Sequence, residues 1–108
     1  MTEHALDFLN PQYHSGMNIT VRKGDKWFKK AREGDKVWIT KTGRSCPETY
    51  GIIKEIDFRK FEEVTIRDLM EEHDRECNSP AGLILAMLRA YPDFTLDDGV
   101  TVIRFYIE

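Results

Sequence analysis

The sequence predicts an α+β fold: a small mixed β-barrel with two or three flanking helices. The chain has 108 residues, enough for a single domain over residues 1–108 with one modest core. Alternating apolar residues predict three strands, two helical patterns follow them, and a last alternating segment ends the chain. A final strand that returns after a helical excursion is typical of a partly closed barrel whose opening the helices cover.

The first strand follows an irregular lead-in over residues 1–12, where the position before Pro11 is disfavoured in a helix. The strand occupies about residues 18–23, and in it Ile19 and Val21 alternate with polar residues. Period 2 sends the three polar residues to the opposite face: Asn18, Thr20 and Arg22. That face is either a solvent-exposed edge or part of a binding site.

Two more strands are expected before the helices. The segment "KVWIT" places Val37 and Ile39 on one face and Trp38 on the other. The segment "YGIIKEIDF" forms the third strand, and Gly51 near its start predicts a bulge or a close approach of another backbone.

The helical region has two start signals and is followed by the last strand. Thr65 with Asp68 three residues later resembles a capping box and predicts a helix over about 66–76. Ser79 is a good N-cap and Pro80 a good first residue for a second helix, which carries an apolar stripe. The last strand, "VTVIRFYIE", has four side chains on one face: Thr101, Ile103, Phe105 and Ile107.

Composition excludes several classes of protein. No apolar run approaches the roughly 18 residues needed to span a bilayer, and "MTEHALDFLN" lacks the basic start and apolar core of a secretory signal. Cys46 and Cys77 lie far apart without a C-x-x-C partner, which is typical of reduced thiols. We therefore expect a cytoplasmic protein that does not bind membranes. We also expect it to be a monomer or a weak homodimer.

The net charge of −3 conceals an asymmetry along the chain. Residues 21–45 hold nine basic and three acidic side chains, whereas residues 55–76 hold nine acidic and four basic ones. Such a division can orient an anionic ligand. The alternative is that both segments are solvated faces without a partner.

Sequence motifs for cofactors and metals are absent. There is no G-x-G-x-x-G and no G-x-x-x-x-G-K-[ST], so no nucleotide cofactor is expected. His73 and Cys77 are four residues apart, but no second His/Cys pair completes a zinc site, so no metal is expected. Cys77 could act as a nucleophile with His73 as its base, although a core cysteine is the commoner case.

Two aromatic residues stand among lysines in "KGDKWFKKAREGD". Trp27 and Phe28 could stack on bases while the lysines meet phosphates. The alternative is a hydrophobic plug that holds this turn onto the barrel. On the first strand, Thr20 offers a hydroxyl, and Arg22 offers a planar cation suited to phosphate or carboxylate.

Six segments together resemble one known family. They are "ITVR", "GDKVWI", "GIIKEID", "F-x-x-V-T-I-x-D-L-x-x-x-H", "AYP" and "VTVIRFYI", in this order over Tyr13 to Glu108. They resemble the ASCH family of PUA-like domains, and most of all its short bacterial members typified by the N4-acetylcytidine amidohydrolase. The resemblance implies a small PUA-like β-barrel that binds RNA or nucleosides, with hydrolysis in a few members.

The resemblance also implies site residues. In the family signature G-x-K-x-x-[TE]-x-R, the threonine falls on Thr20 and the arginine on Arg22, whereas the lysine position is Met17. The catalytic glutamate of the hydrolytic members aligns with Glu76, and a one-residue gap makes Cys77 the alternative. Because Met17 cannot act as an amine, either another residue supplies one or the site only binds. The candidates for that replacement are Lys23, Lys41 and His14.

Three functions follow from these patterns. The first is a module that binds RNA, a nucleotide or a modified nucleoside in a cleft between barrel and helices. Its expected ligand-binding residues are Tyr13, Met17, Asn18, Arg22, Lys23 and Trp27. The second is a small hydrolase of the amidohydrolase or ribonuclease type, with Thr20 and Glu76 catalytic. The third is a protein-interaction adaptor that uses the divided charge.

Overall fold

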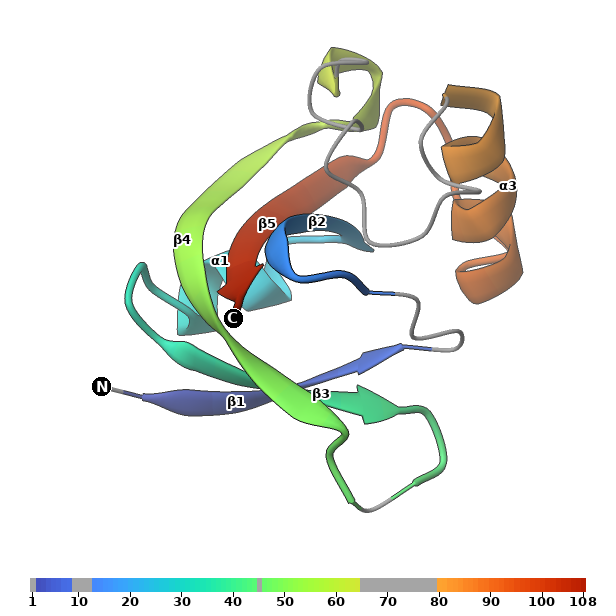
Figure 1. The fold of residues 1–108 in the computed structure, drawn as a ribbon. Coiled ribbons are helices and arrows are strands. Elements are labelled where there is room, and N and C mark those ends of the chain that lie inside the picture. The colour runs from blue at the N-terminus through green and yellow to red at the C-terminus, as the bar shows by residue number, and fades with distance from the viewer. Residues whose placement is uncertain (1, 9–12, 45, 65–79) are drawn as a thin grey trace.

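The computed structural model describes residues 2–8, 13–44, 46–64 and 80–108, and contains one five-stranded mixed sheet (Figure 1). The strands are β1 (Glu3–Phe8), β2 (Gly16–Lys23), β3 (Lys36–Lys41), β4 (Thr49–Lys60) and β5 (Gly99–Ile107). The helices are α1 (Lys26–Lys30), the short 3₁₀ helix η1 (Phe61–Glu63) and α3 (Pro80–Ala90). The helix predicted over 66–76 lies outside the described residues.

The sheet order is β1-β3-β4-β5-β2, so β1 and β2 form its two edges. β1 runs parallel to β3, and the other neighbouring strands are antiparallel. The sheet curls strongly (Figure 1), and the side chain of Arg22 on β2 reaches the main chain of Asp7 on β1. The predicted α+β fold, a small and partly closed mixed barrel with flanking helices, is confirmed.

Two apolar clusters lie on the two faces of this sheet. The inner cluster fills the barrel and has as buried members Leu6, Phe8, Ala31, Val37, Ile39, Ile53, Ile103, Phe105 and Ile107. The second cluster joins β2 and β5 to α3 and η1, with buried members Ile19, Val21, Phe61, Leu83, Met87, Phe94, Val100 and Val102. Burying one Val, Leu, Ile, Phe or Met side chain stabilises a fold by about 1.5–3 kcal/mol. A chain this short therefore needs both clusters.

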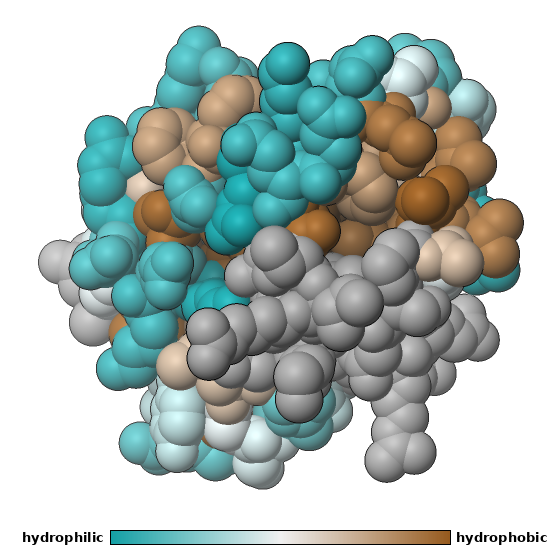
Figure 2. All heavy atoms as spheres, turned by 90° about the horizontal axis from the view of Figure 1, so that it is seen from above, coloured by the Kyte–Doolittle hydropathy of each residue, from teal (hydrophilic) through white to brown (hydrophobic). Residues whose placement is uncertain are grey.

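Helix α3 covers the second cluster with one side and leaves its other side in contact with solvent. Leu83 and Met87 are buried, whereas Leu85 and Leu88 are exposed. Figure 2 shows apolar atoms gathered on the side of the molecule where α3 lies. The predicted second helix is confirmed over Pro80–Ala90.

Strand β2 shows the predicted alternation, yet it is buried on both faces. Ile19 and Val21 belong to the cluster under α3. Asn18 and Thr20 pair with inward-facing residues of β5 and are 0% and 3% exposed, respectively. Their polar face therefore points into the barrel, and a solvent-exposed edge is excluded for these two residues.

The predicted irregular lead-in is wrong for Glu3–Phe8, which form strand β1. Leu6 and Phe8 alternate with exposed residues and are buried in the barrel, so β1 gains its stability from packing that the short sequence signal did not reveal. The close approach predicted at Gly51 is confirmed. A Cβ there would lie 3.0 Å from Cδ2 of Phe105 and 3.1 Å from the carbonyl oxygen of Tyr106.

Candidate functional site

Arg22 bridges the two edge strands of the barrel. Its Nε donates to Oγ1 of Thr20 at 3.2 Å, and its Nη1 donates to the carbonyl oxygen of Asp7 at 2.7 Å. The guanidinium carbon lies 4.6 Å from the ring centroid of Phe8. Because contacts from both strands fix the plane of the guanidinium, Arg22 is held as an oriented cation rather than a mobile one.

Helix α1 brings a second cation, Lys30, and a second aromatic ring, Trp27, toward Arg22. Nζ of Lys30 lies 3.9 Å from the ring centroid of Trp27. Trp27 is half-buried against the inner cluster, and its ring meets the ring of His4 edge-on with centroids 5.7 Å apart. The predicted hydrophobic plug is therefore confirmed for Trp27, and the same ring also supports a lysine ammonium.

The charged groups around Lys30 shift its pKa in opposite directions. Burial lowers the pKa of Lys30, and the nearby positive charges of Lys26 and Arg22 lower it further, while Asp7 acts in the opposite direction. A positive charge placed among other positive charges is stabilised when an anion binds. We call Phe8, Thr20, Arg22, Trp27 and Lys30, with Lys26 as their neighbour, the seam site.

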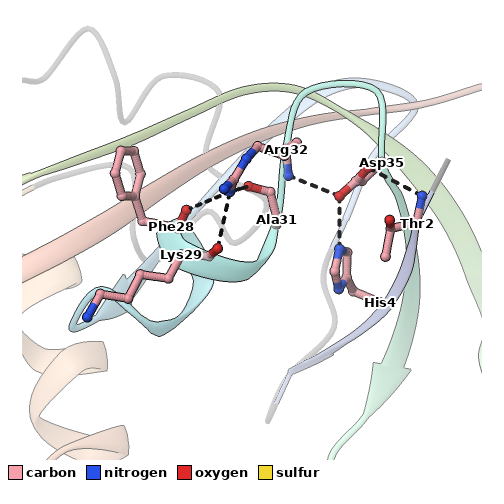
Figure 3. A network of polar contacts seen from close by, with 7 residues as sticks. All are labelled: Thr2, His4, Phe28, Lys29, Ala31, Arg32 and Asp35. Atoms are coloured by element: carbon pink, nitrogen blue, oxygen red, sulfur yellow. Dashed lines mark hydrogen bonds and ion pairs between the residues drawn. The ribbon is translucent and has the colours of Figure 1, made fainter.

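A polar network holds the ends of α1 and β1 together (Figure 3). Oδ2 of Asp35 lies 3.0 Å from Nε2 of His4 and accepts the backbone N–H of Arg32 at 3.0 Å; Oδ1 accepts the N–H of Thr2 at 3.4 Å. The hydrogen bond from His4 is the main cause that lowers the pKa of Asp35. The guanidinium of Arg32 donates to three carbonyl oxygens at the end of α1: Phe28, Lys29 and Ala31. This network positions Trp27 and Lys30.

Three of the predicted ligand-binding residues are already engaged within the chain. Both ends of the Asn18 amide bond the backbone of the turn before β2, with Nδ2 donating to the carbonyl oxygen of His14 at 2.7 Å. Lys23 forms an ion pair with Asp93 at 3.0 Å, which raises the pKa of the lysine. The hydroxyl of Tyr13 donates to Glu48 at 3.2 Å. These three residues are therefore not part of the seam site.

The remaining predicted residues separate into different places. Thr20 and Arg22 contact each other. Met17 lies on the opposite face of β2 from Thr20, in register with Tyr106 of β5. Glu76 lies outside the described residues, so its predicted pairing with Thr20 stays a prediction.

Sequence reasoning alone does not identify Phe8 and Lys30 as site residues. Phe8 falls in the lead-in, where no strand is expected, so its place beside Arg22 could not be foreseen. Lys30 could have been found, because residues three and four positions apart share a helix face and Lys26, Trp27 and Lys30 have that spacing.

Within the described ranges, no group of three or more His, Cys, Asp or Glu side chains is placed to hold a metal ion. The same part of the chain contains no helix long and apolar enough to cross a membrane.

Comparison with known proteins identifies the fold. No protein-family model and no curated protein matches the sequence. The crystal structure of an ASCH domain from Lactobacillus crispatus JV V101 is similar, with a TM-score of 0.70 and 11% sequence identity. The match covers 98% of this chain and 79% of that one. The fold is therefore that of an ASCH domain, as the sequence resemblance predicted.

Proposed function

We propose that the seam site binds a nucleotide, either free or at the end of an RNA strand. The observation that carries this proposal is the gathering of two cations with Lys26 nearby: Arg22 lies over the buried ring of Phe8, and Lys30 lies over the half-buried ring of Trp27. Cations next to aromatic faces are the combination that recognises phosphate and base together. The ASCH fold supports the proposal, since the resemblance implies RNA or nucleoside binding.

Each cation would have a distinct task in this complex. The planar guanidinium of Arg22 suits two oxygens of one phosphate, and its contacts to Thr20 and Asp7 orient it before the ligand arrives. The Lys30 ammonium supplies a compact charge next to Trp27, where a base can stack. Both interactions weaken as salt rises, so nucleotide affinity falls with ionic strength.

Fluorescence of Trp27 tests this proposal. The chain has two tryptophans, so Trp38→Phe leaves Trp27 as the single reporter. Cytidine 5′-monophosphate is expected to quench it with a saturable curve, and Lys30→Gln in this background to weaken binding about tenfold, the loss of one charged hydrogen bond.

Lys29→Gln is the matched control, because Lys29 lies on the same helix but pairs with Asp25 at 3.2 Å. It should leave the affinity unchanged. Absence of saturable quenching, or equal losses in the two variants, would contradict nucleotide binding at the seam and leave the protein-interaction adaptor as the function to pursue.

A hydrolase at the same place is the second candidate. The Thr20 hydroxyl accepts a hydrogen bond from the Arg22 guanidinium, which favours ionisation of that hydroxyl. With Glu76 as the acid/base, Thr20 would attack or position a modified nucleoside. The test is incubation with N4-acetylcytidine and chromatography for cytidine. Product from the wild type and not from Thr20→Val supports catalysis, and no product from either rejects this reaction.

A further inference from the structure

The outward face of the sheet carries a continuous row of side chains across four strands. The strand register places Lys36 of β3 opposite Ile52 of β4, Ile52 opposite Tyr106 of β5, and Tyr106 opposite Met17 of β2. Facing residues in a sheet point to the same side, so these four side chains lie on one surface. The buried neighbours of this row, such as Ile53 and Phe105, point into the barrel.

A pair of aromatic rings lies beside this row. Trp38 and Tyr50 face each other across β3 and β4, with ring centroids 5.6 Å apart and planes at 59°. The Trp38 indole N–H donates to Oε1 of Glu3 at 2.9 Å, so the indole is held in place. Tyr50 and Tyr106 are 43% and 42% exposed, which leaves much of both rings open to solvent.

Two lysines accompany these rings. Nζ of Lys36 lies 4.3 Å from the Trp38 centroid and 4.2 Å from the Tyr50 centroid. Nζ of Lys54 lies 6.0 Å from the ring centroid of Tyr106. Cross-strand aromatic pairing alone explains why Trp38 and Tyr50 stabilise the sheet. It does not explain why the half-buried ring of Trp38 and the exposed rings of Tyr50 and Tyr106 each lie close to a lysine. We call Lys36, Trp38, Tyr50, Lys54 and Tyr106 the outer-face site.

We propose that the outer-face site binds single-stranded nucleic acid, with bases stacked on Trp38, Tyr50 and Tyr106 and backbone phosphates near Lys36 and Lys54. Aromatic rings that each lie close to a lysine match the alternation of bases and phosphates in one strand. This inference rests on the proposed function and deepens it, because the seam ligand is then the end of a strand.

The position of the two sites relative to β1 suits such a strand. His4 contacts Trp27 of the seam site, and the adjacent residue Glu3 contacts Trp38 of the outer-face site. Successive residues of a strand point to opposite faces. The two tryptophans therefore lie on opposite sides of edge strand β1, and a single strand that passes around this edge meets both.

The second single-tryptophan protein tests the proposal. Trp27→Phe leaves Trp38 as the reporter, to be titrated with oligouridylate and oligothymidylate of about 12 nucleotides, a length within the range bound by small barrels. Saturable quenching is expected, and Tyr106→Leu in this background should weaken binding about fivefold or more. Tighter binding of the uridylate identifies RNA as the ligand, and equal affinity identifies single strands of either kind.

Phe58→Leu is the matched control, since Phe58 is 41% exposed and on the same sheet but contacts Phe28 instead. Denaturant unfolding of both variants separates an effect on binding from an effect on stability. Absence of Trp38 quenching, or equal weakening by the two variants, overturns the outer-face proposal. Because mononucleotide binding is read from Trp27 in the other protein, failure at the outer face is distinguishable from failure at the seam.

Discussion

The seam site and the outer-face site use the same contact in different surroundings. Each places a lysine ammonium over an indole, at 3.9 Å for Lys30 and Trp27 and at 4.3 Å for Lys36 and Trp38. At the seam, burial and, after it, neighbouring cations lower the pKa of Lys30, and Arg22 is fixed by main-chain and hydroxyl partners. On the outer face, large ring areas are open to solvent. The first arrangement favours an oriented phosphate, and the second favours stacking without sequence preference.

The largest effect is expected from Arg22→Lys. Lysine keeps the charge but cannot hold Thr20 and Asp7 while it presents two donors to a phosphate. We expect mononucleotide affinity to fall about tenfold or more, since charged hydrogen bonds are removed, and oligonucleotide affinity at the outer face to change much less. Quenching of Trp27 measures the mononucleotide affinity, and quenching of Trp38 in the other single-tryptophan protein measures the oligonucleotide affinity. Full retention of mononucleotide affinity would show that charge, and not orientation, matters at the seam.

A smaller effect is expected from Lys36→Gln on the outer face. For single-stranded nucleic acid, the slope of log affinity against log salt changes by about 0.7 for each phosphate that the protein no longer neutralises. Titrations of the oligonucleotide between about 50 and 200 mM salt should show this change. Mononucleotide affinity at Trp27 should remain as in the wild type. An unchanged slope would mean that Lys36 supports the rings of Trp38 and Tyr50 and does not bind a phosphate.

The smallest effect on binding is expected from Asp35→Asn, which acts through the position of α1. The pKa of Asp35 is lowered in the folded state, so its carboxylate contributes stability above the unfolded-state pKa. That contribution disappears as pH falls below about 4 and through the lowered pKa. The variant should be less stable than the wild type at pH 7, and the difference should shrink in acid. A difference that does not change with pH would exclude this ionic contribution.

How far the sequence predicts this molecule depends on the kind of contact. Period 2 places Ile19 and Val21 opposite Thr20, and it places Val37 opposite Trp38, because alternation depends only on local geometry. It cannot show that the polar face of β2 points into the barrel, since this depends on the curl of the whole sheet. Strand β1 is not evident from the sequence because it pairs in parallel with β3, about thirty residues away, and no turn marks such pairing.

In the candidate sites, too, the sequence predicts local contacts and does not predict contacts between distant strands. The contact between Thr20 and Arg22 follows from their spacing on one strand. The approach of Phe8 to Arg22 and the row from Lys36 to Met17 depend on strand order, which a single sequence does not reveal.

The most direct test of nucleotide binding at the seam is a ¹H–¹⁵N correlation spectrum recorded during titration with cytidine 5′-monophosphate. Trp27→Phe and Trp38→Phe assign the two indole signals. We expect the Trp27 indole and the Arg22 Nε–H signals to shift with one saturation curve, while the Trp38 indole stays in place. Unmoved Trp27 and Arg22 signals at saturating nucleotide, or a shift of Trp38 alone, would contradict binding at the seam.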